Sequence, residues 1–220
     1  MSQTLPPGLR ARVLDSAAKE RAAPPGAWAR RVVGVLAVSA VWLGVAYAMT
    51  GRRGDWDDLS PAYALGTVVA LLTAALVLST VGLSRGRAML GPPVSVQLGL
   101  AVGLPFALAA WSFVVPSAAP TSFPCSSTAD ALRLAKTCDL LSLVLAAPML
   151  GALLFLRRGT QAAVPALTGA CLGAAAATWA HLVMHAHCPT AHPVHVLVGH
   201  ALPLLPVMLA GALVGRRVFR

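Results

Sequence analysis

Apolar runs fill most of the chain from residue 28 onward, and short polar stretches separate them. Each run is close to the ~20 residues that an α-helix needs to cross the hydrocarbon core of a bilayer. The pattern predicts membrane-spanning helices at Ala29–Met49, Pro61–Leu83, Val94–Val115, Cys138–Leu156, Val164–His185 and Val194–Val214. We therefore expect an all-α polytopic membrane protein, folded as a bundle of six transmembrane helices.

Composition supports this class and argues against a soluble domain. The 220 residues are 57% hydrophobic and 11% charged, with a mean hydropathy of +0.75, whereas a soluble domain carries roughly 25% charged residues. The formal charge of +10 resembles that of a nucleic-acid-binding protein. In a membrane protein, however, topology places the arginines, so direct contact with nucleic acid is not expected.

The basic residues are distributed unevenly between the two sides of the predicted bundle. Thirteen of the 17 Lys and Arg residues lie in the N-terminal stretch, in the loops after the second and fourth helices, and in the C-terminal tail. The other four lie on the opposite side, together with five of the seven acidic residues. The positive-inside rule then predicts that both termini are cytoplasmic, which in a bacterium places the protein in the inner membrane.

Glycine pairs spaced four residues apart occur in three of the predicted helices. They are Gly99 with Gly103, Gly169 with Gly173, and Gly211 with Gly215. Small residues at this spacing let membrane helices approach closely. We therefore expect close contacts of the third, fifth and sixth helices.

The N-terminal stretch is the only long polar segment. Leu9, Val13 and Ala17 recur at helical spacing beside basic residues, which predicts a short amphipathic helix. A helix of about three turns is marginal alone in water, so it needs a protein partner, or else it is a basic tail lying on anionic lipid. The chain thus divides into a cytoplasmic segment (1–28), a six-helix transmembrane domain (29–215) and a basic cytoplasmic tail (216–220).

All six histidines and one of the four cysteines fall between His181 and His200. These two histidines lie within predicted helices, where ionisable residues usually serve a function or pair together. The cluster as a whole favours metal or proton chemistry, although for any single histidine hydrogen-bonded packing is the more common role. Zinc, copper and other heavy-metal ions prefer nitrogen and sulfur ligands. The expected ligands are His181, His185, His187, Cys188, His192 and His195. A bracketed haem is a further alternative for His181 and His200, but no second histidine pair supports an electron-transfer chain.

Three of the cysteines fall on the predicted extracytoplasmic side, where thiols meet an oxidising environment. Cys138 and Cys188 are expected at similar depth, which allows a disulfide between them, although sequence gives no Cα distance. Cys125, in the proline-rich loop before the fourth helix, is a third candidate for exchange with either. Cys171 lies within a helix, where a buried thiol is usually inert packing.

The C-terminal half carries a family resemblance. It contains Cys138-Asp139-Leu140-Leu141, then Pro148, Arg157-Arg158-Gly159, His187-Cys188-Pro189, Gly199 and a closing Gly215-Arg216-Arg217. This pattern resembles the six-helix NrsF-like anti-sigma-factor family of bacteria. The resemblance implies a protein that holds an extracytoplasmic-function-type sigma factor inactive at the inner membrane, with a signal sensed by the pair Cys138 and Cys188. The family's usual acidic residues after His-Cys-Pro are replaced here by Thr190-Ala191-His192.

These features give the hypothesis of a membrane-bound anti-sigma factor, not an enzyme, that releases its sigma factor on a periplasmic redox or metal signal. Oxidation of Cys138 and Cys188, or metal capture by Cys188 with nearby histidines, would shift helices four to six. Contacts with the sigma factor are expected at Leu9, Arg10, Val13 and Leu14.

Two other classes remain as alternatives. One is a small metal- or haem-binding membrane protein, or a transporter, that uses the His181–His200 cluster, although the sequence shows no repeat of one half in the other. The second is a membrane thiol oxidoreductase, which is disfavoured because the chain has no Cys-x-x-Cys pair.

Overall fold

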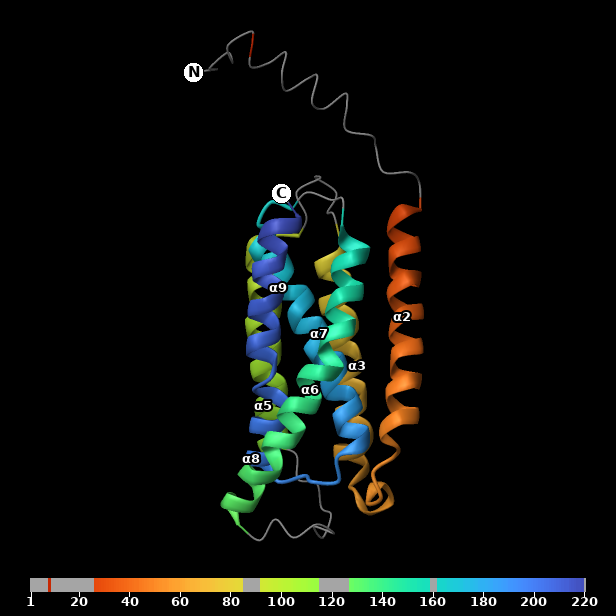
Figure 1. Ribbon diagram of the computed structural model, residues 1–220, viewed down its shortest axis with the longest axis vertical. Helices are drawn as coiled ribbons and strands as arrows, with labels where there is room; N and C mark the ends of the chain where they lie inside the picture. Colours follow the sequence, from red (N-terminus) through yellow and green to blue (C-terminus); the bar gives the residue numbers. More distant parts are fainter. Residues whose placement is uncertain (1–7, 9–25, 85–91, 115–126, 159–161, 220) are drawn as a thin grey trace.

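The computed structural model describes residue 8 and residues 26–84, 92–114, 127–158 and 162–219. Every regular element in these ranges is a helix, and none is a strand. Figure 1 shows long helices that run side by side between two ends of the molecule. The all-α prediction is confirmed. The described residues do not include Cys125 or the expected sigma-factor contacts Leu9, Arg10, Val13 and Leu14.

Five helices are long and apolar enough to cross a membrane. The first four are α2 (Ala27–Thr50), α3 (Pro61–Leu83), α6 (Thr128–Arg157) and α7 (Pro165–His187). The fifth combines α8 (Pro193–Val196), the π-helical turn η3 (Leu197–Ala201) and α9 (Leu204–Val218). A short turn η1 (Trp56–Asp58) lies between α2 and α3.

The third predicted span is built differently from these five. It consists of α4 (Val94–Leu98), the π-helical turn η2 (Gly99–Gly103) and α5 (Leu104–Val114), which follow one another directly. The apolar part, Val94–Leu108, is shorter than the other candidates. A sixth crossing therefore stays a prediction.

Helix α6 begins earlier than hydropathy indicated. We expected a start at Cys138, but the helix starts at Thr128, where the Ser127 side chain accepts a hydrogen bond from the backbone N–H of Asp130 at 3.2 Å. This cap satisfies one of the free N–H groups of the first turn. The first ten residues of α6 are too polar for hydropathy to predict them as part of a membrane span. Nevertheless, Ala131 and Ala135 on their inner face are fully buried. Cys138 consequently lies well inside the helix.

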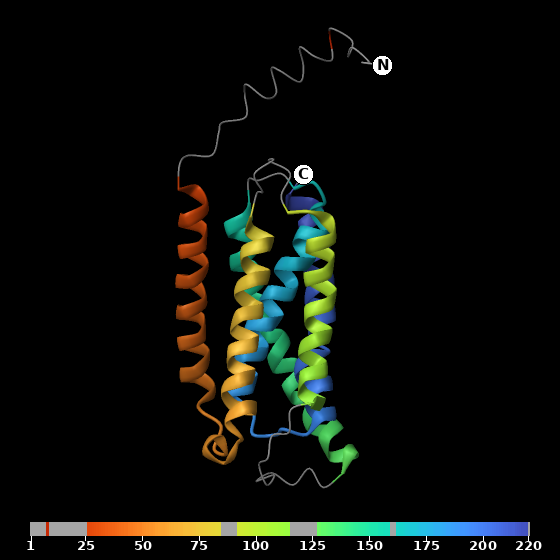
Figure 2. The same ribbon diagram turned by 180° about the vertical axis from the view of Figure 1, so that it is seen from behind.

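Helix α7 forms the centre of the bundle, because 89% of its apolar stretch is buried, against 17% for α2. It packs most extensively on α9 and also contacts α3 and α6. In both side views α2 stands at the edge of the bundle (Figures 1 and 2). The residues at the end of α7 are therefore positioned by three neighbouring helices.

Glycines bring α7 and α9 into direct backbone contact. A Cβ built on Gly173 would lie 2.5 Å from the Val207 carbonyl oxygen and 2.7 Å from the Met208 Cα. The same crowding, with a backbone atom of the facing helix under 3.0 Å away, holds for Gly169, Gly211 and Gly215. The close approach predicted for the fifth and sixth helices is confirmed.

The third predicted helix contacts α7 through α4 and η2, but not through its glycine pair. A Cβ on Gly99 or Gly103 would meet nothing within 4 Å among the described residues. Spacing alone places small residues on one face, but it does not say whether another helix covers that face.

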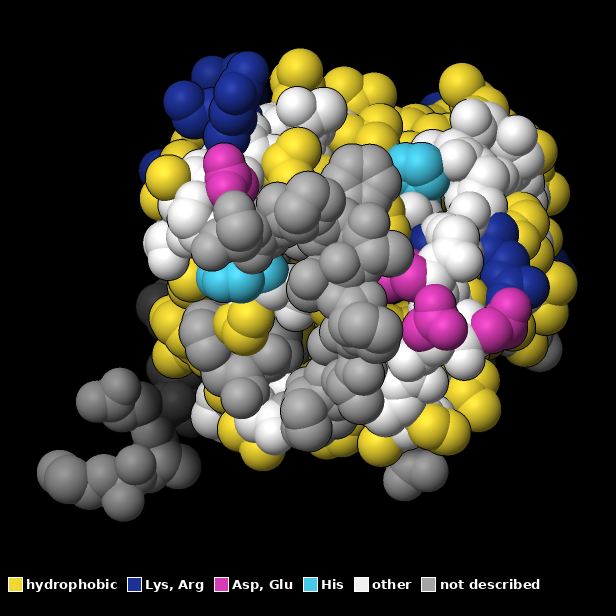
Figure 3. All heavy atoms as spheres, turned by 90° about the horizontal axis from the view of Figure 1, so that it is seen from below, with side chains coloured by type: hydrophobic (Ala, Val, Ile, Leu, Met, Phe, Trp, Pro, Cys, Tyr) yellow, Lys and Arg dark blue, Asp and Glu magenta, His cyan; other side chains and the backbone are white. Residues whose placement is uncertain are grey.

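Charged residues separate toward the two ends of the bundle. One end carries arginines near the start of α2 and near the ends of α6 and α9: Arg30, Arg31, Arg157, Arg158, Arg216 and Arg217. The other end carries all five acidic residues of the described chain, Asp55, Asp57, Asp58, Asp130 and Asp139. Figure 3 views the molecule from this second end, where acidic and basic side chains lie close together and histidine atoms reach the surface.

The glycine contact gives a prediction for stability. Gly173→Ala forces its Cβ against backbone atoms of α9, so we expect a loss of about 1–3 kcal/mol in the free energy of unfolding. The matched change Gly103→Ala meets open space and should be neutral or slightly stabilising. Both are measured by SDS-induced unfolding of the protein in detergent micelles, followed by circular dichroism. Equal stability of the two variants would contradict the backbone contact.

Candidate metal and thiol site

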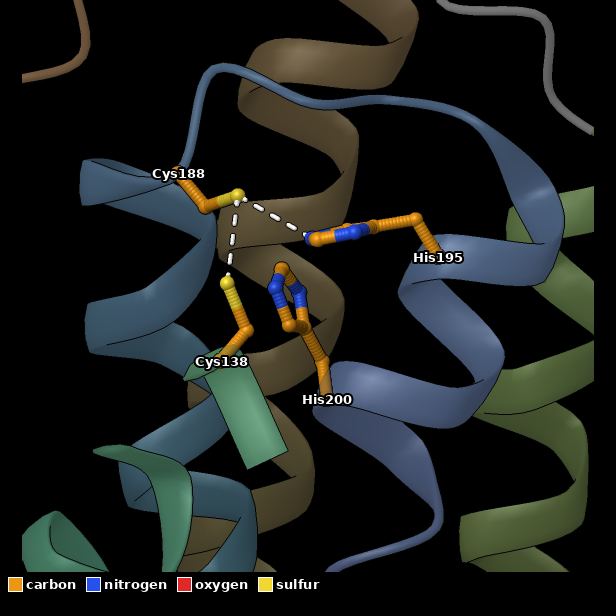
Figure 4. Close-up of side chains that lie close together, drawn as sticks. All are labelled: Cys138, Cys188, His195 and His200. Atoms are coloured by element: carbon orange, nitrogen blue, oxygen red, sulfur yellow. Dashed lines mark hydrogen bonds between the residues drawn. The ribbon is translucent and has the colours of Figure 1, made fainter. Parts of the chain in front are cut away.

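Two thiols and two imidazoles come together near the acidic end of the bundle. Cys138 comes from α6, Cys188 follows the last residue of α7, His195 belongs to α8 and His200 to η3 (Figure 4). One ligand atom from each residue lies within 4.8 Å of the other three. Four separate elements therefore converge on one point.

Short distances define the group. The Sγ atoms of Cys138 and Cys188 are 3.8 Å apart, and Cys188 Sγ lies 3.3 Å from His195 Nε2. The other ring nitrogen of His195, Nδ1, lies 3.3 Å from the carbonyl oxygen of Ala131. When Nδ1 carries the proton it donates to this carbonyl, which leaves the Nε2 lone pair directed at Cys188.

His200 completes the group with an unpartnered nitrogen. The side chain is 3% exposed, and its Nε2 makes no hydrogen bond with the described chain. Its ring packs edge to face on His195, with centroids 5.2 Å apart, and on His181 at 5.6 Å. In Figure 4 the ring lies between Cys138 and His195. A buried polar atom without a partner is uncommon in proteins and calls for an explanation such as a ligand.

The surroundings of the pair favour the thiolate form of Cys188. The hydrogen bond from Cys138, helped by His195, outweighs the effect of burial and holds the pKa of the Cys188 thiol below its usual range. The thiolate form is the nucleophile and the metal ligand. This geometry therefore suits either thiol oxidation or metal binding.

Gly199 lets η3 approach α6 beside the thiols. A Cβ at Gly199 would lie 3.1 Å from both the Ala135 carbonyl oxygen and the Cys138 Cβ. The Ser142 hydroxyl donates a hydrogen bond to the Gly199 carbonyl at 3.1 Å. These contacts set the distance of Cys138 from His195 and His200.

A buried ion pair fixes the loop that carries Cys188. The Arg53 guanidinium donates two hydrogen bonds to the Asp55 carboxylate, at 2.7 and 2.8 Å. It also donates to the carbonyls of His185 at 3.3 Å and Pro189 at 3.0 Å. Both charged side chains are almost completely buried, with exposures of 1% and 2%. Arg53 thus holds both sides of Cys188 in place.

Sequence reasoning missed this ion pair, since Arg53 and Asp55 entered only as loop charges. The available signal was opposite charges two residues apart, in a short loop on the same side as the thiols.

Two of the other histidines contact backbone carbonyls away from this group. His185 Nε2 lies 3.2 Å from the Ala64 carbonyl oxygen, and its ring packs on Trp56 and Tyr63. His187 Nδ1 lies 3.4 Å from the Gly51 carbonyl oxygen. The four-residue group thus does not include four of the expected ligands, His181, His185, His187 and His192. Only Cys188 and His195 of the expected metal ligands belong to it, and Cys138 and His200 complete it.

A haem has no room between His181 and His200. Their rings meet edge to face, and the cavity beside them has a volume of about 10 Å³, which is space for about one water. Cys171 lies apart from this site, with Sγ donating to the Gln97 carbonyl at 3.3 Å. Its burial fits the expected packing role.

The ion pair gives a prediction. Arg53→Met leaves the Asp55 carboxylate buried and unpaired, which should lower the free energy of unfolding by about 3–5 kcal/mol and slow oxidant-induced cross-linking of Cys138 to Cys188. The matched change Arg52→Met removes a pair with exposures of 49% and 89% and should cost about 0–1 kcal/mol.

Unfolding in detergent and mass spectrometry of the cross-linked thiols measure the two effects. The double variant Arg53→Met with Asp55→Leu should recover much of the stability but not the cross-linking rate. Behaviour of Arg53→Met like that of Arg52→Met would contradict the role of Arg53 as a clamp.

Comparison with known proteins agrees with these features. The family model described as NrsF, negative regulator of sigma F, matches residues 17–220. Searches of the curated proteins and of the solved structures found no match. Since the family model covers nearly the whole chain, including every described helix, this protein belongs to the NrsF family of negative regulators of sigma factors.

Proposed function

We propose that this protein is an inner-membrane anti-sigma factor that binds an extracytoplasmic-function-type sigma factor and releases it when Cys138 and Cys188 react. The observation that carries the proposal is the family match along residues 17–220. The role is one of binding and release, and we assign no catalytic residue.

The proposed topology has six crossings with both termini in the cytoplasm. Five apolar helices support it, and the unbroken helical run from Val94 to Val114 extends about 30 Å at 1.5 Å per residue. The arginine-rich end of the bundle would face the cytoplasm. Cys138, Cys188 and the histidines would then face the periplasm.

The sigma factor would bind on the cytoplasmic side. The segment 1–28 offers Leu9, Val13 and Leu14 as an apolar face and Arg10 as a cation. A short amphipathic helix becomes ordered when a partner covers its apolar face. Bound in this way, the sigma factor is kept from RNA polymerase.

The signal would be a chemical change at the thiol pair. In the redox route, hydrogen peroxide oxidises the Cys188 thiolate to a sulfenic acid and leaves as hydroxide. The Cys138 thiol then attacks the Cys188 sulfur and expels water, so that one S–S bond forms and the peroxide has taken up two electrons. In the metal route, both sulfur atoms bind one ion. A disulfide draws the two sulfur atoms from 3.8 Å to about 2.0 Å and so changes how α6 packs on the α7–α9 pair, whereas a bound ion fixes α6 against that pair. A tenfold weakening of sigma-factor binding requires a coupling free energy of about 1.4 kcal/mol.

A small metal-binding membrane protein or transporter is the second candidate, favoured by the four-residue thiol and imidazole group. Capture of a sigma factor separates this candidate from the regulator.

The regulator predicts that the full chain captures its sigma factor through the N-terminal segment. The double variant Leu9→Asp with Val13→Asp places charge on the apolar face, so co-purification of the sigma factor should fall at least tenfold. The double variant Ala11→Asp with Ala18→Asp adds the same two charges on the opposite face of the predicted helix and serves as the matched control. If both proteins capture equal amounts, the binding surface lies elsewhere; if the wild type captures no sigma factor, the function itself is wrong.

The thiol pair predicts the response to signal. In cells with a reporter for the sigma-factor regulon, Cys138→Ser and Cys188→Ser should abolish induction by oxidant and heavy metal. Cys171→Ser changes a buried thiol outside the site and should respond as the wild type does. A wild-type response in both site variants would defeat the assignment of Cys138 and Cys188 as the sensor.

A further inference from the structure

We infer that Cys138, Cys188, His195 and His200 form a closed tetrahedral site for one divalent zinc-like cation, which ties α6 to the α7–α9 pair. The regulatory consequence rests on the proposed function, but the binding itself is measured independently of it.

The distances match a tetrahedral centre. With Zn–S of about 2.3 Å and Zn–N of about 2.0–2.1 Å, two sulfur ligands lie about 3.8 Å apart, and sulfur and nitrogen lie about 3.5 Å apart. The structure has 3.8 Å between the two Sγ atoms and 3.3 Å between Cys188 Sγ and His195 Nε2. These two distances fit a tetrahedral centre, and all four ligand atoms lie within 4.8 Å of one another, so small side-chain movements would bring them around one ion.

The surroundings of the two imidazoles are those of metal ligands. A ligating histidine usually donates its second ring N–H to a carbonyl or carboxylate, which fixes the tautomer. His195 has this partner in the Ala131 carbonyl, 3.3 Å from Nδ1. His200 is 3% exposed and keeps Nε2 without a hydrogen bond in the described chain, and a metal ion would satisfy such an atom.

Charge selects the type of ion. Two thiolates and two neutral imidazoles carry two negative charges, so a dication gives a neutral site and binding releases two thiol protons. A monovalent ion would leave a net negative charge in a largely buried position, which is costly without a partner. Arg53 does not supply that partner, because Asp55 already neutralises it. The site therefore favours a divalent tetrahedral ion over Cu⁺.

The ligand count points to a structural or regulatory site. Four protein ligands fill a tetrahedral coordination sphere, whereas catalytic zinc keeps one position open. The nearby histidines do not extend the group, since His185 and His187 contact backbone carbonyls. The ion would thus be held, with no free position for a substrate.

Metal binding and disulfide formation exclude each other at this site. Oxidation of the bound form joins the two sulfurs, frees the cation and passes two electrons to an oxidant such as a peroxide, which takes up two protons to form water. Cys138 is the only ligand on α6, so loss of the metal removes a bond between α6 and the rest of the site.

Cobalt binding to the purified full chain tests the site. The reduced protein in detergent is titrated with Co²⁺, and Zn²⁺ then displaces it. We expect one Co²⁺ per chain, with the visible bands of tetrahedral cobalt and the charge-transfer bands of cobalt–sulfur bonds. Absence of binding, or an octahedral spectrum, would overturn the proposal.

Single substitutions test the ligand set. Cys138→Ser, Cys188→Ser, His195→Gln and His200→Gln should each weaken Zn²⁺ binding by more than the roughly 10–100-fold that loss of an outer partner costs. The controls Cys171→Ser, Cys125→Ser and His187→Gln should bind as the wild type does. Wild-type affinity in His200→Gln, or loss of binding in Cys125→Ser, would refute this ligand set.

A protection measurement covers variants that do not fold. In the wild-type chain, Zn²⁺ should slow alkylation of Cys138 and Cys188 at least tenfold and leave Cys171 unchanged. Equal alkylation with and without Zn²⁺ would refute the site whatever the variants do. Capture of the sigma factor, assayed with and without Zn²⁺, reports on the proposed function separately: metal binding without capture refutes the regulator alone, and capture without metal binding refutes the site alone.

Discussion

The backbone contact between α7 and α9 is the constraint on which the rest of the structure depends. At Gly169, Gly173, Gly211 and Gly215 the two helices touch without intervening side chains. Membrane helices gain little from hydrophobic burial against each other, so close van der Waals packing of this kind sets their positions. Cys188 follows α7, and His195 and His200 precede α9 on the same hairpin. Three of the four site residues are therefore positioned by one rigid pair of helices.

Cys138 stands apart because it belongs to α6. Its helix meets the hairpin beside the site through the Gly199 contact and the hydrogen bond from Ser142 to the Gly199 carbonyl. A single methyl group at Gly199 would push against the Cys138 Cβ. The spacing of the two thiols thus depends on how α6 sits against the hairpin, and a bond formed at the thiols acts back on that spacing. This reciprocity is the physical requirement for a sensor, since a ligand shifts only an equilibrium whose two states it binds differently.

The sequence was most informative about features that the bilayer determines, namely the length and position of the apolar helices. Hydropathy located the long helices, and Cys138 and Cys188 lie close together as expected, although Cys138 lies inside α6 and not at its start. The sequence was least informative about side-chain partners that depend on how neighbouring helices pack. His181 and His185 were both expected as metal ligands, but His185 turns to Ala64 on α3 while His181 packs on His200. Likewise, Arg53 and Asp55 acquire their role only when the loop folds over the end of α7, a tertiary contact that no local pattern encodes.

Helix α6 also connects the site to the opposite end of the bundle. From Cys138 to Arg157 it extends about 28 Å at 1.5 Å per residue, which is close to the thickness of a bilayer core. The side chain of Arg157 is fully buried, and its Nη1 donates to the carbonyls of Leu83 and Ser84, where α3 ends. The thiol site and these carbonyls thus hold α6 at two points, with Pro148 between them. The last turn of α3 depends on Arg157 to satisfy its free carbonyls. A movement of α6 at the thiols would therefore change these hydrogen bonds where α3 ends, at the arginine-rich end of the bundle.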